Sequence, residues 1–471
     1  MSSRLAPSAV AVAALAALAA CGSDVSLGGP NTLVRVDVEP DGANCAGGGA
    51  AIHTGLDGDG DRFLDDAEIS STQYVCNGAS LVQCAGGTIA KGTVTIRSAA
   101  ELPALAGVNC IDGDLLIAGS DAADLGELAD LHTITGDLVI AGNPALTSLD
   151  GLANLQQLGD TYLVQGNDLL ADISAIGKLR RAAQITIVGN DGLTDLAGLE
   201  SFVDLHSVLT IANNANLTSL TGLDNLVTTN RTITIRANRS LASLAALDRL
   251  RAGVLIEISG NASLPQISLA GLEKIDGRIL INTNAAATRV ELPALTTVGD
   301  FMQLNGNAAL ARIDVPALLT IGGFLVNNST SLTTISAPSL VFATASVELQ
   351  AAARLAEVDF AELGSIGGSL LVSNVPMLAN LNGFPGLRSI GNALTVNAAG
   401  ALRSFAGLGA LEVVSGDLTV TNNGQLSSFA GLDSIAEVGE DLTITGNPQL
   451  PRAASQAFAS GITVRGLVTI N

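Results

Sequence analysis

The stretch GDLVIAGNPALTSLDGLANL, residues 136–155, decides the fold of most of the chain. Leu138 and Ile140 alternate with Val139, which is the pattern of a short strand that buries one face. A Gly-Asn pair that ends at Asn143 then turns the chain at a corner. Apolar residues at a spacing of three follow and fill the remaining sides of one coil, namely Leu146, Leu149, Leu152 and Leu155.

The same coil recurs along the chain. Asparagine returns at the corner at Asn143, Asn167, Asn190, Asn214, Asn238, Asn261, Asn284, Asn307, Asn423 and Asn447, and is replaced at Ser329, Ala352, Val375 and Ala399. The spacing averages about 23 residues and gives about fifteen coils. An inward-turned Asn amide can hydrogen-bond the backbone of adjacent corners, which would form a ladder. The sequence therefore predicts an all-β-dominated repeat protein, a right-handed parallel β-helix or leucine-rich-like solenoid.

The composition fits stacked coils and excludes one class of partner. Hydrophobic residues make up 48% of the chain, but aromatic residues only 3%, so Leu, Ile, Val and Ala must fill the core. The formal charge of −22 leaves no basic surface for phosphates, and we expect no nucleic acid to bind.

The N-terminus predicts export and lipid anchoring. Arg4 precedes the apolar run Ala9–Ala20, which is too short to span a bilayer and suits a signal peptide over residues 1–20. The run ends at Leu18-Ala-Ala-Cys21, which resembles a bacterial lipobox and marks Cys21 for lipidation; the alternative is an ordinary signal with an incidental cysteine. Residues 21–42 are expected to be a tether. We predict anchoring by N-terminal acyl chains at the outer membrane or cell surface, because glycine and not aspartate follows Cys21.

Four cysteines remain after lipidation. They are Cys45, Cys76, Cys84 and Cys110, and an even number in an exported protein suggests two disulfides. Proximity in the sequence favours the pairs Cys45–Cys76 and Cys84–Cys110.

A small acidic module is predicted over residues 43–80. It holds DGDGDRFLDDAE, residues 57–68, in which oxygen ligands fall at the positions of a calcium-binding loop: Asp57, Asp59, Asp61, the Phe63 carbonyl, Asp65 and Glu68. Arg62 departs from this pattern, because the loop normally has glycine there for a sharp turn. Calcium is therefore the expected cofactor, and the alternative is a solvated acidic turn held by the Cys45–Cys76 disulfide.

Residues 81–471 resemble the receptor L-domain family, the leucine-rich-like β-helices of growth-factor-receptor ectodomains. The resemblance rests on the L-x-I-x-x-N-x-x-L coil and on an opening segment between Cys84 and Cys110. In that family a cysteine pair staples the first coil, which implies a Cys84–Cys110 disulfide. This chain has about twice as many coils as a receptor L-domain and lacks the cysteine-rich domains that separate those, so no ligand contacts carry over.

No catalytic constellation stands out. The three histidines, His53, His132 and His206, lie in unrelated contexts without zinc or Ser-His-Asp spacing. We therefore expect a non-enzymatic surface lipoprotein that presents a sheet face of the solenoid to a protein or cell-envelope partner. The alternatives are a structural envelope scaffold without a specific ligand and a carbohydrate-active β-helix enzyme.

The last coil suggests how the solenoid ends. Residues 451–460 have Ala453, Ala457 and Phe458 at helical spacing, which predicts a short amphipathic helix over the core. The following strand, Leu467–Ile470, would keep an open edge, and we expect weak self-association at the C-terminal end.

Overall fold

The computed structural model describes residues 32–39, 49–56, 68–76, 82–180, 182–205 and 208–471. These form two compact units, divided between Leu81 and Val82. In the first unit, β1 (Thr32–Glu39), β2 (Gly49–Leu56) and β3 (Ile69–Cys76) form an antiparallel sheet in the order β1-β2-β3. The strand β1 lies within the stretch predicted to be a tether, so the ordered unit begins before residue 43. Alternating Val34, Val36 and Val38 are the strand signal in this segment.

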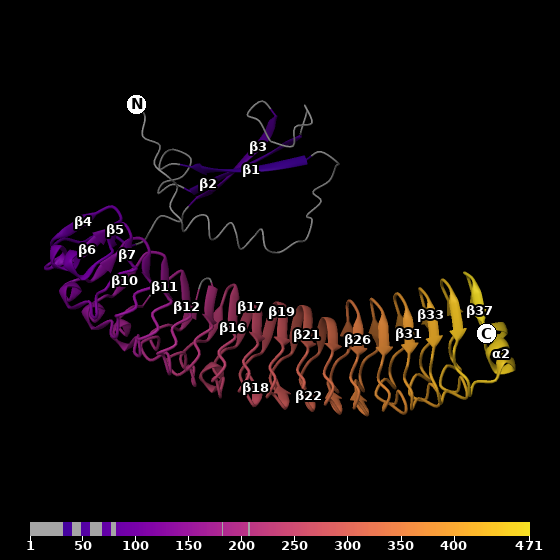
Figure 1. The fold of residues 1–471 in the computed structure, drawn as a ribbon. Helices are drawn as coiled ribbons and strands as arrows, with labels where there is room; N and C mark the ends of the chain where they lie inside the picture. Colours follow the sequence, from indigo (N-terminus) through magenta and orange to yellow (C-terminus); the bar gives the residue numbers. More distant parts are fainter. Residues whose placement is uncertain (1–31, 40–48, 57–67, 77–81, 181, 206–207) are drawn as a thin grey trace. The chain divides into compact units, whose positions relative to one another are not determined.

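The second unit, Val82–Asn471, is a β-solenoid of about 16 turns spaced roughly 23 residues apart, which confirms the predicted fold. One strand from each turn joins a continuous parallel main sheet; Figure 1 shows the coils stacked one behind another. Its strands are β5 (Val94–Ile96), β7 (Leu115–Ala118), β9 (Leu138–Ala141), β11 (Thr161–Gln165), β12 (Gln184–Val188), β14 (Val208–Ala212), β16 (Thr232–Arg236), β17 (Ala252–Ser259), β19 (Lys274–Asn282), β21 (Thr297–Asn305), β23 (Thr320–Asn327), β26 (Val347–Gln350), β29 (Leu370–Ser373), β31 (Leu394–Asn397), β33 (Leu418–Thr421), β35 (Leu442–Thr445) and β37 (Val468–Ile470).

A shorter strand precedes the main strand in many coils. These strands are β4 (Ile89–Lys91), β6 (Cys110–Asp112), β8 (Thr133–Ile134), β10 (Gln157–Leu158), β13 (Asp204–Leu205), β15 (Thr228–Thr229), β25 (Phe342–Ala343), β28 (Ser365–Ile366), β30 (Ser389–Ile390), β32 (Val413–Val414), β34 (Glu437–Val438) and β36 (Thr463–Val464). In the central coils β17, β19, β21 and β23 extend over 8 or 9 residues and include this segment, so the sheet is widest there.

The side of the coil after the corner changes along the solenoid. Five 3₁₀-helices lie there in the first half: η1 (Ala99–Leu105), η2 (Gly126–Leu128), η3 (Asp150–Leu152), η4 (Ser174–Ile176) and η5 (Ala245–Leu247). The central coils instead form a parallel five-stranded sheet from β18 (Gln266–Ser268), β20 (Arg289–Glu291), β22 (Arg312–Asp314), β24 (Thr334–Ser336) and β27 (Glu357–Asp359). The labels β18 and β22 in Figure 1 mark this second sheet on the side of the coils away from β17 and β21.

The core is one continuous apolar cluster inside the coils. The inward residues of successive strands stack on one another, as Leu138, Tyr162 and Ile185 do, and each is fully buried. Stacking removes from water the apolar faces that a single coil would expose, and this burial is the main driving force for the fold.

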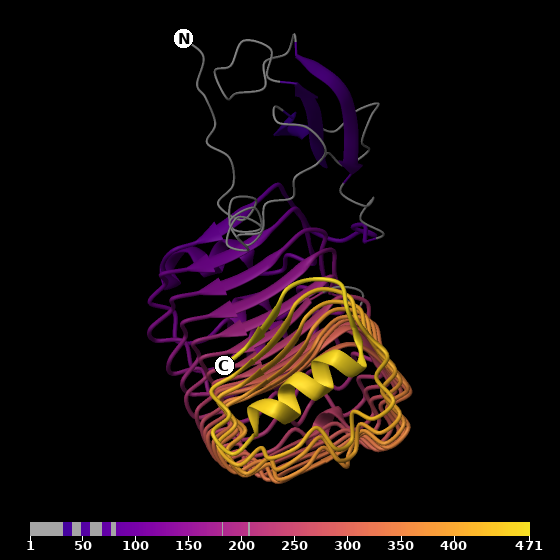
Figure 2. The ribbon, with the colours of Figure 1, turned by 90° about the vertical axis from the view of Figure 1, so that its right-hand side faces the viewer.

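The predicted C-terminal helix is present as α2 (Arg452–Gly461). Figure 2 looks along the solenoid and shows α2 lying across its last coil. The buried face differs from the predicted one, because Ala453 and Ala457 are exposed, whereas Ser455 is buried and Phe458 packs against the core. Phe458 stacks on Phe429 with ring centroids 4.2 Å apart, so the aromatic contact sets the rotation of the helix.

Candidate functional site

The solvent face of the main sheet is the candidate binding surface. Parallel pairing places one outward side chain per coil in a single row: Val139, Leu163, Thr186, Thr210, Thr234, Glu257, Leu280, Gln303, Leu325, Glu348, Leu371, Thr395, Thr419 and Thr443. The two carboxylates of this row, on Glu257 and Glu348, are four coils apart, roughly 20 Å at one strand spacing per coil. That separation is too large for a catalytic carboxylate pair.

The central coils carry an apolar patch on this face. Leu280, Phe301 and Leu325 are half-buried on neighbouring strands, although their side chains point to solvent. The exposed Arg278 places its guanidinium carbon 5.4 Å from the centre of the Phe301 ring, within cation–π range. Gly323, which has no side chain, is paired with Phe301 on the next strand. We call Arg278, Leu280, Phe301 and Leu325 the central patch.

Local irregularities of the strands shape the central patch. The pairing register shifts between Gly253 and Leu255 and again between Val298 and Phe301. Such bulges bend a strand and change the direction of the side chains around them. The contact between Arg278 and Phe301 does not depend on these shifts, because β19 and β21 pair with a constant offset of 23 residues. The repeat spacing is the sequence signal that could have revealed it.

The Asn residues of the corners meet inside the solenoid. Asn190 is fully buried, and its Oδ1 accepts a hydrogen bond from the Asn167 N–H at 3.0 Å. Its Nδ2 donates to the Val164 carbonyl of the same preceding coil at 2.9 Å. The Asn190 N–H in turn donates to Asn214 Oδ1 at 2.9 Å. Equivalent bonds join the run of asparagines from Asn143 to Asn307 and the pair Asn423 and Asn447.

The residue before each of these corners is left-handed. It is glycine in many coils, as at Gly142 with φ of 61°, where a side chain would be strained. Thr283 adopts the same conformation with φ of 54°, which is uncommon for a β-branched residue. The corner is therefore imposed by the stacking of neighbouring coils and not only by local preference.

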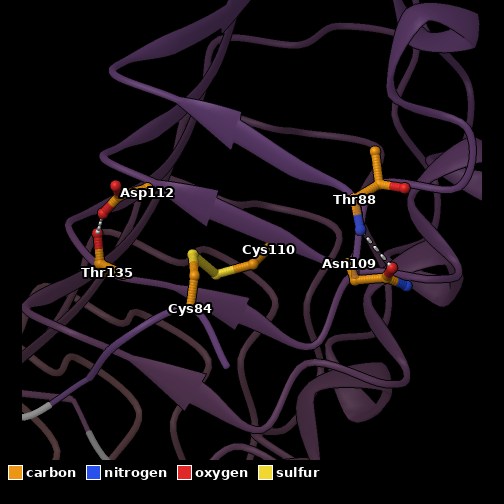
Figure 3. The surroundings of a disulfide bond; sticks show 6 residues. All are labelled: Cys84, Thr88, Asn109, Cys110, Asp112 and Thr135. Carbon is orange, nitrogen blue, oxygen red and sulfur yellow. Dashed lines mark hydrogen bonds between the residues drawn. A yellow bond between two sulfur atoms is a disulfide. The ribbon is translucent and has the colours of Figure 1, made fainter. Parts of the chain in front are cut away.

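The predicted Cys84–Cys110 disulfide is present and closes the start of the solenoid (Figure 3). The two Cα atoms lie 5.7 Å apart, and the bond links residues separated by 26 positions. Beside it, Asn109 Oδ1 accepts the N–H of Thr88 at 2.9 Å, so the first two coils are joined by covalent and polar contacts. Cross-linking the ends of this loop lowers the entropy of the unfolded chain.

Most other predicted site residues lie outside the described residues. These are Cys21, Cys45, Asp57, Asp59, Asp61, Phe63, Asp65 and His206, and the side chain of Cys76 at the end of β3 is also outside them. Glu68 is described and is half-buried. Within the described part of the chain, no three His, Cys, Asp or Glu side chains are grouped as a metal site would require. No helix in that part is long and apolar enough to cross a membrane.

The two described histidines are engaged in separate units. His53 Nδ1 lies 2.8 Å from Thr72 Oγ1 across the β2–β3 pair, and His132 Nδ1 lies 2.6 Å from the Asp130 carbonyl.

A row of aspartates escaped the sequence analysis. Asp114 Oδ1 accepts the N–H of Asp137 at 3.0 Å, and Asp137 Oδ1 accepts the N–H of Thr161 at 2.9 Å. Desolvation raises the pKa of Asp137, and so does the charge of Asp114. Desolvation and the charges of Asp137 and Asp114 raise the pKa of Asp160. An Asp at the same position two coils in succession is the signal that could have revealed these bonds.

Comparison with known protein families gives a match within the N-terminal unit. Residues 31–76 match a family described as a domain of unknown function (DUF7151), and this range contains all three strands of the first sheet. No curated protein matches the chain.

Proposed function

We propose that the protein is a non-enzymatic envelope lipoprotein whose main sheet presents the central patch to a protein or cell-envelope partner. The observation that carries the proposal is the central patch, in which the exposed Arg278 and the half-buried Leu280, Phe301 and Leu325 lie on a face where threonine is the commonest residue. Aromatic residues and arginine surrounded by apolar contacts are typical of the residues that dominate binding energy in protein interfaces. A pure scaffold would not need such a patch in its widest sheet.

The N-terminal segments complete this proposal. Cys21 would carry the acyl chains that hold the protein at the outer membrane or cell surface, and the resemblance to receptor L-domains supports a binding role for the solenoid. Calcium held by Asp57, Asp59, Asp61, the Phe63 carbonyl, Asp65 and Glu68 would order the N-terminal unit. Replacing Cys21 by serine should release the protein from membranes, and unchanged membrane partition would contradict the lipid anchor.

The binding role is tested with two matched double variants of the full chain. Leu280→Glu with Leu325→Glu places two charges in the central patch, and Thr395→Glu with Thr443→Glu places two charges elsewhere on the same row. Both pairs of side chains are half-buried, and circular dichroism verifies that both variants are folded. Immobilised wild-type protein and both variants are exposed to solubilised envelope, and the retained species are quantified.

We expect the patch variant to retain at least tenfold less of the bound species, and the control to retain about as much as the wild-type protein. A partner that covers the patch would bury two unpaired charges, which costs more than about 1.4 kcal/mol of binding free energy. Equal retention by all three proteins would exclude the central patch as the binding site. Retention of nothing by the wild-type protein would favour the scaffold alternative.

A further inference from the structure

A groove of about 630 Å³ opens on the solenoid away from the central patch. Three consecutive coils contribute its lining, which includes Gln156, Lys178, Arg180, Glu200, Ser201 and Val203. It follows η4 in the chain and lies at the corner that precedes the short strands of the coils.

One inter-coil hydrogen bond is missing beside the groove. At this corner each coil normally donates a backbone N–H to a carbonyl of the coil before it, as Gln156 does to His132 at 2.9 Å and Val227 does to Val203 at 2.8 Å. The bond from Arg180 to Gln156 is stretched to 3.4 Å. Between the next two coils, no hydrogen bond joins the described Val203 N–H to the Arg180 carbonyl. The coils are therefore held together less tightly beside the groove, whose lining includes both Arg180 and Val203.

The side chains around this opening supply positive charge. Lys178 Nζ donates to the neutral Asn154 Oδ1 at 2.7 Å, and both Lys178 and Arg180 are exposed. Among the described residues, neither cation forms an ion pair. These unpaired cations lie in a chain with a formal charge of −22, so they are not part of a generally basic surface.

The rest of the lining suits a hydroxylated ring. Glu200 Oε2 accepts the Gly198 N–H at 2.8 Å and keeps its other carboxylate oxygen available as an acceptor. Gln156 offers an amide, and the Ser201 hydroxyl donates to the Leu179 carbonyl and can still accept. Val203 is 46% exposed and gives the groove an apolar contact surface.

We propose that this groove binds an acidic saccharide, a sugar residue that carries a carboxylate. Lys178 and Arg180 neutralise the carboxylate, Glu200 and Gln156 bond to ring hydroxyls, and Val203 contacts the C–H face of the ring. Inorganic phosphate would use only the cations, and its doubly charged form would be repelled by Glu200 more strongly than a single carboxylate. An acidic peptide would lack the hydroxyl donors that the Glu200 carboxylate can accept. The central patch takes no part in this site, so loss of either site leaves the other proposal untouched.

The test uses the full chain and isothermal titration with four probes: an oligomer of galacturonic acid, the neutral galactose oligomer of equal length, inorganic phosphate and an oligoglutamate peptide. We expect the uronate oligomer to bind and the other three to bind at least tenfold more weakly. Because the contact is charge-assisted, the affinity should also fall as the salt concentration rises.

A double variant and a matched control identify the residues responsible. Lys178→Gln with Arg180→Gln should weaken uronate binding at least tenfold, since it removes both positive charges. Arg249→Gln is the control, because Arg249 donates to Asn225 at 2.9 Å as Lys178 does to Asn154 but lies outside the groove lining. Circular dichroism verifies that both variants are folded. If the double variant fails to fold, Arg180→Gln alone, which removes no side-chain hydrogen bond among the described residues, replaces it.

Absence of uronate binding by the wild-type chain would overturn the proposal. Equal uronate binding by the groove variant and the Arg249→Gln control would do so too. Preference for phosphate or for the peptide would reject the saccharide class and assign the groove to that other anion.

Discussion

Two parts of the solenoid hold neighbouring coils together in different ways. From Asn143 to Asn307 every corner has a buried asparagine, and each amide bonds to the coil before it. At Ser329, Ala352, Val375 and Ala399 the amide is missing. Here large rings fill the interior instead: Phe360 lies 5.6 Å from Phe324 and 5.2 Å from Phe384 between ring centroids, and all three are fully buried.

The difference shows that the ladder is directional. Asn307 accepts from the Asn284 N–H and donates to the Ile281 carbonyl, so its amide is satisfied by the preceding coil alone. The ladder can therefore stop at Ser329 without leaving the last amide unpaired. It can also restart, because Asn423 accepts the N–H of Ala399. The side-chain amide of a corner asparagine therefore hydrogen-bonds the backbone of the coil before it. In the coils without this amide, buried apolar side chains stabilise the stack instead.

Removing a ring should produce the largest effect. Phe360→Ala deletes a fully buried side chain between two other rings and leaves a cavity, which costs about 3–5 kcal/mol of unfolding free energy. Phe301→Ala on the solvent face is the control and should cost much less, because Phe301 is only half-buried. Urea denaturation measures both variants, and equal losses would contradict a stacked aromatic core.

Removing the side-chain amide of one corner asparagine should have the second-largest effect on stability. Asn190→Leu leaves the Val164 carbonyl and the Asn167 N–H without their side-chain partners. We expect a loss of about 1–3 kcal/mol, because buried polar groups without hydrogen bonds are destabilising. The same urea experiment tests it, and a neutral substitution would mean that the asparagine is only a turn residue.

Adding a corner asparagine where the ladder stops should have a smaller effect and should stabilise the fold. Ser329→Asn places a side-chain amide beside the Asn307 N–H and the Leu304 carbonyl, which correspond to the two groups that Asn307 bonds in the preceding coil. Two new hydrogen bonds should stabilise by about 1 kcal/mol in total, after the larger side chain is accommodated. A lower melting temperature would show that the coils from Ser329 onward cannot accept the ladder geometry.

The smallest effect concerns the aspartate row of the N-terminal coils and depends on pH. Because folding raises the pKa of Asp160, the folded state favours the protonated carboxyl, and this stabilisation disappears as the pH rises through the raised pKa. Asp160→Asn should therefore raise the melting temperature near pH 7 and change it little near pH 3. A variant that gains nothing at neutral pH would contradict the repulsion among Asp114, Asp137 and Asp160.

Much of this organisation was predictable from the sequence. The alternation at Leu138 and Ile140, the recurring corner asparagine and the cysteines at 84 and 110 each follow from rules that act within one coil or between adjacent coils. The helix over residues 452–461 also followed from spacing, although its covered face did not. Phe458 selects that face by stacking on Phe429, a contact between coils that helical periodicity does not encode.

Features that depend on differences between coils were not predicted. Beside the groove, the described Val203 N–H does not bond to the Arg180 carbonyl, and nothing in the sequence at these two positions indicates that this bond is missing. The second sheet was also missed, although its coils carry a signal. Their buried positions after the corner include one step of two residues, from Ile267 to Leu269, where coils with 3₁₀-helices keep steps of three. A repeat pattern specifies what coils share, whereas the candidate sites lie where they depart from it.

Amide hydrogen exchange resolved by residue tests the account of the ladder most directly. The N–H groups of Asn143, Asn167 and Asn190 each donate to the next asparagine Oδ1, and they should exchange slowly. The described N–H groups of Ser329 and Val375 have no such partner and should exchange at least tenfold faster, although these residues are equally buried. The Ala399 N–H donates to Asn423 Oδ1, so it should exchange slowly although Ala399 itself has no side-chain amide. Uniform protection across both groups would contradict a directional asparagine ladder.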